Sequence, residues 1–536
     1  MKTLEKHYYL DNFKTLIAHA QCHYYDLLTD DEKNWLAGFE KLSIQAQSLL
    51  VRMYSRKGNL FRSDKLQYDE IGETTAPLQE LEQAQFIWLN PVLSAYEMGA
   101  ELLTKPEICS IYAIESKTLS KQALLDHLLL HDPDCTQRPT FTIVQLSHEQ
   151  VLNILCVLFF ANNRQDLTQF VTSELGLQNF ERYALSPERR FFQNRSDVDQ
   201  LISIGEIKRK FDEERASLTF EELNTLNEQL SGTSTNEYVE RRRQHLVNDI
   251  ARQLERLGHL EVALSFFQST SLPPSRERQV RIHVKRKELA LAHQLLEQML
   301  RESTNVDENE IAQRIIKRNR AQFSIPIDEK TIDEKREFHV IPVWQERVEY
   351  ASLRYFEELY PQSKIYYLEN HLICGLLGLA LWPAIFADVQ GAFINAYQSA
   401  PLDLYSSRFV EKREKLVSSL LARIKSGDTG YLYEILREKK GLQNPFVNWS
   451  IWDSSLLASA LNSIDHHSLH AIFSIMLKDL RHYRTGFPDL VAFHDTTFEW
   501  FEIKGPGDKL QENQKRWLRH FNELNISYRV CYIRAV

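Results

Sequence analysis

The chain has 536 residues, with 64 lysines and arginines against 73 aspartates and glutamates, so its formal net charge is −9 at pH 7. This balance argues against a globally basic nucleic-acid binder, although a local basic groove is enough to bind phosphates. Hydrophobic residues make up 43% and charged residues 26%, which is typical of a soluble globular protein.

The length predicts roughly three or four domains. No apolar stretch reaches the roughly 18 unbroken residues that a membrane span requires, and the start, MKTLEKHYYLDNF, has no apolar signal region. We therefore expect no membrane contact and a place in the cytosol. The six cysteines are scattered and form no C-x-x-C pair, which suits reduced thiols and argues against a zinc finger.

Residues 1–90 are predicted to form an N-terminal helical domain. Its amphipathic runs are residues 13–28, 31–41 and 43–54. After the third run, Arg56, Lys57 and Lys65 alternate with aromatic residues. This mixture is typical of a DNA contact, but a solvated helix end and a winged-helix-like turn explain it equally well.

Residues 91–135 hold two predicted amphipathic helices, 98–112 and 121–130, joined by a polar link. The pattern resembles a SAP-type module, a small helical DNA-binding element. Lys117 and Lys121 would then face phosphate groups. A plain helical hairpin is the alternative, and the two prolines that follow predict a joint between domains.

Residues 140–320 are predicted to be helical, and residues 236–290 are basic, with eleven lysines and arginines against seven aspartates and glutamates. The candidate DNA-binding residues here are Arg241, Arg242, Arg252 and Arg281. An apolar pattern that starts at Leu260 recurs 29 residues later at Leu289. Stacked helical hairpins of tetratricopeptide type would produce this repeat, and a generic helical bundle explains it nearly as well.

Residues 330–536 are predicted to form the last domain, entered through a segment with two prolines. Glu369 stands at the start of residues 369–386, a helical run that is apolar on all sides and therefore buried. From the residues alone, the ordinary role of this glutamate is to cap the helix N-terminus.

A predicted β-hairpin near the C-terminus carries the candidate catalytic residues. Its strands are residues 490–493 and 498–504, separated by the polar turn 494–497. Alternation along the second strand puts Glu502 and Lys504 on one face. Pairing with the first strand brings Asp489 beside them, and the strand ends at Gly505-Pro506-Gly507.

This combination of side chains suits metal-assisted cleavage of a phosphodiester. Asp489 and Glu502 are hard oxygen ligands for Mg²⁺ or Mn²⁺, and the Ile503 carbonyl could add a third oxygen. Lys504 would orient the attacking water and stabilise the transition state. Gln514, on a predicted helix over 512–524, is a candidate supporting residue.

Three short motifs carry a resemblance to a known nuclease domain. They are G-x-P-D-L around Asp489, E-x-K-G-P-G-D from Glu502, and Q-x-x-W from Gln514. Together they resemble the virus-type replication-repair nuclease (VRR-NUC) domain, a branch of the PD-(D/E)xK nucleases. The resemblance implies a predominantly α multi-domain protein with a C-terminal α/β nuclease core. This core would be a small mixed sheet flanked by helices, at about residues 425–536, with the helix 369–386 beside it.

The whole chain, in order, resembles the Fanconi-associated nuclease family, most specifically at residues 366–404 and 477–517. The resemblance implies that Glu369 is a further metal ligand and that Arg481 matches a position that binds a 5′-phosphate in some members. It implies a 5′ flap endonuclease and 5′-to-3′ exonuclease that acts on branched or flapped double-stranded DNA in interstrand crosslink repair. The ubiquitin-binding zinc finger of longer members is missing, so we expect a short bacterial-type member in the cytosol and nucleoid.

Two other functions compete with this interpretation. A DNA-binding scaffold with an inactive nuclease fold is disfavoured because Asp489, Glu502 and Lys504 are all intact. A Holliday-junction resolvase would act as a symmetric dimer, which the long helical N-terminal part would obstruct, so we expect a monomer.

Overall fold

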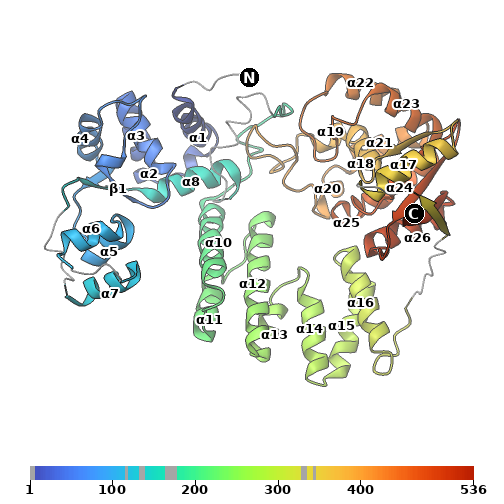
Figure 1. The fold of residues 1–536 in the computed structure, drawn as a ribbon, viewed down its shortest axis with the longest axis horizontal. Coiled ribbons are helices and arrows are strands. Elements are labelled where there is room, and N and C mark those ends of the chain that lie inside the picture. The colour runs from blue at the N-terminus through green and yellow to red at the C-terminus, as the bar shows by residue number, and fades with distance from the viewer. Residues whose placement is uncertain are drawn as a thin grey trace. The chain divides into compact units, whose positions relative to one another are not determined.

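The computed structural model describes residues 6–114, 119–131, 139–162, 178–327, 335–341 and 346–535. Over these residues the chain is mostly helical, as predicted (Figure 1). It divides into two compact units, Met1–Leu177 with Phe192–Gly205, and Gln178–Phe191 with Glu206–Val536. Among the helices of the described residues, none has the length and apolar character to cross a membrane.

The first unit starts with a helical bundle that matches the predicted amphipathic runs. Its helices are α1 (Tyr8–Tyr24), α2 (Asp30–Lys41), α3 (Ile44–Tyr54), α4 (Thr75–Gln83) and α8 (Glu149–Phe160). Thr29 and Glu32 form a capping box that starts α2, and Ser43 caps α3. Trp35 and Phe39 stack in the core between these helices.

A three-stranded sheet completes this bundle, and it extends the unit beyond the boundary predicted at residue 140. The strands are β1 (Leu60–Arg62), β2 (Ile87–Leu89) and β3 (Ile143–Leu146), in the order β1-β3-β2. Leu60 pairs with Gln145 and Ile87 with Leu146. Each strand has only three or four residues and pairs across a long sequence separation, so no hairpin signal marks it.

Residues 95–131 form three helices instead of the two predicted. They are α5 (Ala95–Glu101), α6 (Lys105–Ile111) and α7 (Lys121–His131). The helix predicted over 98–112 is wrong because it is interrupted before Thr104. The Thr104 backbone N–H and hydroxyl both donate to Glu107 at 2.8 Å, and Pro106 follows in the first turn of α6.

A run of helices fills the first part of the second unit, after α10 (Arg195–Glu214) and α11 (Phe220–Gln229). They are α12 (Glu237–Leu257), α13 (Leu260–Gln268), α14 (Ser275–Lys285), α15 (Leu289–Arg301) and α16 (Val306–Arg318). Successive helices pack on one another (Figure 1). Ala263 and Ala292 are both buried at equivalent positions, but Leu289 is 36% exposed, so the repeat is only partly reflected in the core.

The C-terminal part contains the predicted mixed sheet. Its strands are β4 (Arg336–Ile341), β5 (Lys364–Tyr367), β6 (Leu490–Phe493), β7 (Phe498–Lys504) and β8 (Tyr528–Ala535). The order is β4-β8-β7-β6-β5. The pairs β5–β6 and β6–β7 are antiparallel, and the pairs β7–β8 and β8–β4 are parallel. The predicted hairpin is therefore confirmed with the predicted bounds.

Helices cover both faces of this sheet, and the alternation along β7 decides what each face packs against. Phe501 and Ile503 join the core under α17 (Val348–Leu359). Trp500 joins the larger core that contains α26 (Glu512–Leu524). The other helices of that core are α18 (His371–Ala380), α19 (Trp382–Ile385), α20 (Arg408–Glu411), α21 (Glu414–Lys425), α22 (Gly430–Glu438), α23 (Ser454–Ser463), α24 (His466–Met476) and α25 (Leu480–Tyr483).

Candidate active site

The structure brings Asp489, Glu502 and Lys504 together at the β6–β7 hairpin. Asp489 immediately precedes β6, and its Oδ2 accepts a hydrogen bond from the Ile503 backbone N–H at 2.8 Å. The Lys504 ammonium lies 2.7 Å from Oε1 of Glu502. Glu502 is 0% exposed and Lys504 6% exposed, so the pair is shielded from solvent.

Gln514, in the first turn of α26, holds both partners of this pair. Its Nε2 donates to Oε1 of Glu502 at 2.7 Å, and its Oε1 accepts from Lys504 Nζ at 3.1 Å. Because one amide bonds to both, its position fixes the orientation of the carboxylate and of the ammonium. Within the described residues, no donor reaches Oε2 of Glu502.

Glu369 reaches the same site from a turn, and not from a helix as predicted. It lies between β5 and α18 with φ of +43°, and α18 begins only at His371. The backbone N–H groups of Leu368 and Glu369 both donate to the Asp489 carbonyl at 3.1 Å. The Tyr367 hydroxyl donates to the Glu369 carboxylate. Glu369 is therefore tied to Asp489 through the backbone, and Asn370 occupies the N-cap position of α18.

A close backbone approach also holds the loop before Asp489 against α26. Gly486 has φ of +98°, and a Cβ at this position would come 2.5 Å from the Asn513 carbonyl group. Only glycine combines this left-handed conformation with so close a backbone approach. Asn513 directly precedes Gln514, so the contact sets the distance between the Asp489 loop and the helix that carries Gln514.

Burial and mutual repulsion disfavour the ionised forms of the carboxyl groups in this site. Burial raises the pKa of Asp489 to about 6, and the charge of Glu369 adds to this effect. Burial, followed by the charge of Asp489, raises the pKa of Glu502 to about 8. Lys504 offsets only part of the repulsion. Raised pKa values of this kind are typical of buried carboxyl groups that lie close together at a functional site.

A divalent cation fits these residues. The donors are carboxylate oxygens, which Mg²⁺ and Mn²⁺ prefer, and a buried oxygen of Glu502 faces no donor among the described residues. Asp489, Glu502 and Glu369 would hold the ion, and the Ile503 carbonyl stays a predicted fourth oxygen. The roles of these residues remain predictions that the activity tests below address.

A basic cluster lies on α12 and α25, and it contains two of the predicted DNA-binding residues, Arg241 and Arg481. Burial and then the charge of Arg481 lower the pKa of Arg241. Burial and then the charges of Arg241 and Arg481 lower the pKa of His245. An anion would relieve the repulsion between the partly buried Arg241 and the exposed Arg481.

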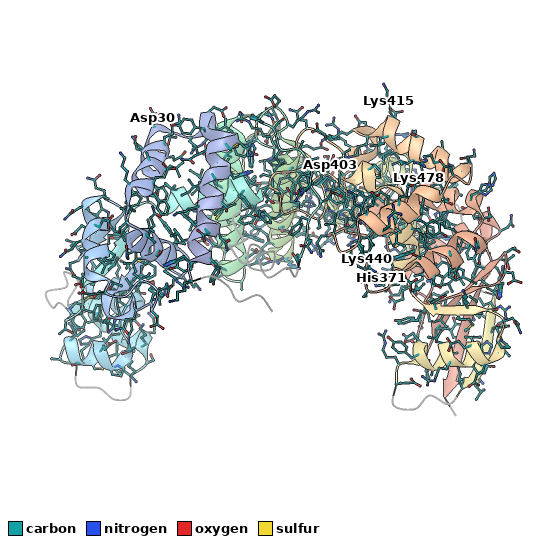
Figure 2. The ribbon with its side chains drawn as sticks, turned by 90° about the horizontal axis from the view of Figure 1, so that it is seen from above. Asp30, His371, Asp403, Lys415, Lys440 and Lys478 are labelled. Carbon is teal, nitrogen blue, oxygen red and sulfur yellow. The ribbon has the colours of Figure 1, made fainter. Side chains whose placement is uncertain are left out.

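Sequence reasoning missed His245 and Arg484, which extend this basic cluster. His245 lies four residues after Arg241 on α12, and Arg484 donates to the Tyr405 hydroxyl at 3.1 Å. Asp403 accepts a hydrogen bond from the buried Arg413 guanidinium at 2.9 Å. Figure 2 labels Asp403, together with His371 at the start of α18. This bond anchors the loop that leads to Tyr405. The helical spacing of four residues was the one signal for His245.

Among the other predicted DNA-binding residues of the second unit, Arg242 adjoins this cluster, because its charge also contributes to the lowered pKa of His245, whereas Arg252 and Arg281 lie elsewhere. In the second unit, Arg242 donates to the Tyr238 hydroxyl at 2.7 Å, Arg252 is exposed, and Arg281 pairs with Glu277 at 2.7 Å. Arg281 also lines a cavity of about 590 Å³ between α14 and α16.

In the first unit, the predicted basic residues form two groups. Arg56 donates to the Lys65 carbonyl at 3.2 Å and lies over the Tyr68 ring, while Lys57 is exposed. Lys121 donates to the Ala100 carbonyl at 2.9 Å, so it joins two helices of its own module. Lys117 lies outside the described residues.

Two family models match the chain. The model described as "FAN1, HTH domain" matches residues 7–88, which include α1 to α4, and the "VRR-NUC domain" model matches residues 429–535. The second match contains Asp489, Glu502, Lys504 and Gln514.

Similar proteins cover the full length. The Fanconi-associated nuclease 1 homolog of Pseudomonas aeruginosa is 32% identical, over 99% of this chain and 96% of its own. The Oryza sativa homolog is 24% identical over 98% of this chain and 63% of its own, and the Homo sapiens protein is 23% identical over 99% and 62%. The chain thus spans somewhat less than two thirds of these two eukaryotic relatives.

Two solved structures have the same fold over the whole chain. A crystal structure of paFAN1 bound to 2-nucleotide 5′ flap DNA with a gap has a TM-score of 0.87 and 31% identity, covering 100% of both chains. A second, bound to 1-nucleotide 5′ flap DNA with a gap, has a TM-score of 0.85 and 31% identity over 99% of this chain and 100% of the other.

Proposed function

The chain belongs to the Fanconi-associated nuclease family, and from this premise we propose that it cuts 5′ flap DNA in a reaction that depends on Mg²⁺ or Mn²⁺. As a family member with a VRR-NUC domain it is a DNA-cleaving hydrolase. The observation that carries the proposal is the group of Asp489, Glu502 and Lys504 within that domain, in which Gln514 orients the buried Glu502 and Lys504.

The side chains have distinct tasks in this mechanism. When bound, the metal ion would lower the pKa of a water molecule and offset the charge that grows on the phosphate. Asp489 is held in place by the Ile503 N–H, so it is aligned before the ion binds. Lys504 would orient the attacking water and donate to the phosphate oxygens. Gln514 keeps Lys504 in position for that role.

Selection of a 5′ flap would depend on contacts away from the hairpin. The similar structures hold 5′ flap DNA, and the basic cluster around Arg241 and Arg481 offers this chain a positively charged site for phosphate. We propose that the protein acts as a monomer on branched or flapped duplexes. Stepwise 5′-to-3′ exonuclease cleavage and interstrand crosslink repair are the further roles that we propose, in the compartment that holds the DNA.

The test compares 5′ flap, 3′ flap and four-way-junction DNAs with Mn²⁺, with Mg²⁺ and with chelator. We expect metal-dependent cutting of the 5′ flap, lost in Asp489→Ala and Lys504→Ala proteins that still fold and bind DNA. Preferred symmetric cutting of the junction by a dimer would favour a resolvase instead. Tight binding without cutting in any metal would favour a scaffold, and normal cutting by either variant would refute the assigned site.

A further inference from the structure

The edge strand β4 has its polar and apolar side chains on unexpected sides. Phe338 and Val340 are 61% and 62% exposed, whereas Glu337 and His339 point to the face that α17 covers. The His339 ring lies 5.2 Å from the ring of Phe356 on α17. A strand at the edge of a covered sheet ordinarily turns its apolar residues inward. The inverted pattern indicates that Glu337 and His339 have a functional role on the covered face.

The register of the sheet adds a third donor to these two. β4 is parallel to β8, and Glu337 pairs with Cys531. The thiol of Cys531 is 0% exposed and joins the same covered face. One carboxylate oxygen, one imidazole nitrogen and the sulfur of these residues all lie within 4.8 Å of one another.

We propose that Glu337, His339 and Cys531 bind a divalent transition-metal ion of the zinc type. Imidazole nitrogen, thiolate sulfur and carboxylate oxygen are the donors that zinc takes in proteins, whereas Mg²⁺ and Ca²⁺ avoid sulfur. Nε2 of His339 lies 3.2 Å from Oε2 of Glu337. Bonds of about 2.0–2.1 Å in a tetrahedral site separate two such ligands by roughly 3.3 Å. Three protein ligands leave the fourth position to water.

The site is separate from the nuclease centre because it lies on the opposite face of the sheet. Cys531 pairs in register with Ile503, and both belong to the core under α17. Glu502 and Lys504 flank Ile503 along β7 and therefore point to the other side. The two centres also differ in donors, since no sulfur is among the predicted ligands of the nuclease centre.

Arg529 lies close to the proposed site, and its positive charge would repel a metal ion there. Its guanidinium lies 3.3 Å from Glu337, but it is bound more closely to Glu499, at 2.9 Å, and to the Tyr360 hydroxyl, at 3.0 Å. Glu499 therefore balances most of its charge. With the metal ion bound, Arg529 would act as a hydrogen-bond donor that orients the ligating carboxylate. Without an ion, Arg529, Glu337 and His339 would form only a hydrogen-bonded network.

The test uses Co²⁺ as a spectroscopic probe on the full-length Asp489→Ala protein, in which the nuclease centre has lost a ligand. We expect one equivalent of Co²⁺ to produce the near-ultraviolet band of thiolate-to-cobalt charge transfer. The band should vanish in the Cys531→Ser protein and persist in the control Cys374→Ser, which alters another buried thiol. No band in the parent protein, or a band that survives Cys531→Ser, would overturn the proposal.

A second readout guards against misfolding of the cysteine variant. His339→Gln and Glu337→Gln each remove one donor while keeping the sulfur, and circular dichroism with chelator establishes that each is folded. We expect Zn²⁺ to raise the melting temperature of the Asp489→Ala parent, and each donor variant to bind Zn²⁺ at least about 10-fold more weakly. Equal Zn²⁺ affinity in parent and variants would show that the group is only a hydrogen-bonded network.

Discussion

Arg516 on α26 and Glu310 on α16 form a buried two-point ion pair, with nitrogen–oxygen distances of 2.9 and 2.8 Å. The arginine is 4% exposed and also donates to Asp307 at 2.6 Å and to the His482 carbonyl at 3.2 Å. Because Gln514 lies one half-turn earlier on α26, this pair fixes α16 to the helix that orients Glu502 and Lys504.

Arg516→Met should therefore reduce both stability and cleavage. Removing Arg516 takes the main counter-charge from Glu310, whose side chain is 13% exposed, and breaking a buried pair in this way costs about 3–5 kcal/mol. We expect kcat on flap DNA to fall more than the affinity for DNA, because the change loosens α26. Denaturant unfolding and single-turnover kinetics measure the two effects.

Arg519→Met is the matched control for this change. Arg519 contacts the same glutamate at 3.0 Å from the same helix, but its side chain is 25% exposed. We expect a loss of about 1 kcal/mol or less. Equal effects of the two substitutions would contradict the role given to Arg516.

Glu502→Gln should stabilise the protein in chelator at pH 8. A carboxyl whose pKa rises from 4.5 to about 8 on folding binds its proton more tightly in the folded state. Its contribution to the free energy of unfolding is present below about pH 4.5 and is lost as the pH rises through about 8. Glutamine cannot ionise, so the melting temperature of the variant should exceed that of the parent at pH 8, and the difference should shrink toward pH 5.

The control for this prediction is Glu499→Gln on the same strand. Glu499 pairs with Arg529 at 2.9 Å, so its removal should destabilise the protein at pH 8. Saturating Mg²⁺ or Mn²⁺ should reverse the advantage of Glu502→Gln, because the ion binds more tightly to, and so stabilises more, the protein that keeps this carboxylate. A Glu502→Gln protein that melts below its parent in chelator at pH 8 would contradict the assigned burial.

Gly486→Ala should impair both folding and cleavage. The new Cβ would meet the Asn513 carbonyl at 2.5 Å and would have to adopt φ of +98°. The clash should push the Asp489 loop from α26 and cost more than the roughly 1–2 kcal/mol of the left-handed backbone alone. Gly507→Ala measures that backbone cost separately, since φ there is +85° and nothing lies within 4 Å. Equal losses in the two variants would show that the close approach is unimportant.

The hairpin and α26 could be predicted from the sequence because their signals are local. Short apolar and aromatic strands bounded by turn residues define β6 and β7, and period-two alternation places Glu502 and Ile503 on opposite faces of the sheet. Glu369 could be placed at the site only by family resemblance. Its link to Asp489 is a backbone contact between residues 120 positions apart, which no local pattern encodes.

Other features escaped prediction for the same reason. β3 is a four-residue strand whose partners lie far away in the sequence. Arg516 has no distinguishing signal in the sequence, because its acidic partners lie about 200 positions earlier on α16. The break before Thr104 was different, because the Thr-x-x-Glu capping box that starts α6 is visible in the sequence.

Arg481→Ala should weaken the binding of 5′ flap DNA by removing a charge from the basic cluster. The cluster brings Arg481 close enough to Arg241 and His245 to lower the pKa of both, so a bound phosphate would relieve this repulsion. Each phosphate contact contributes about 0.9 to the slope of the logarithm of the binding constant against the logarithm of the salt concentration. We expect the slope to decrease by about 1 in the variant.

Arg437→Ala, which removes an arginine paired only loosely with Glu438 at 3.4 Å, should leave both affinity and slope unchanged. An unaltered salt slope in Arg481→Ala would place the phosphate contact elsewhere and would remove the basic cluster from the proposed path of the DNA.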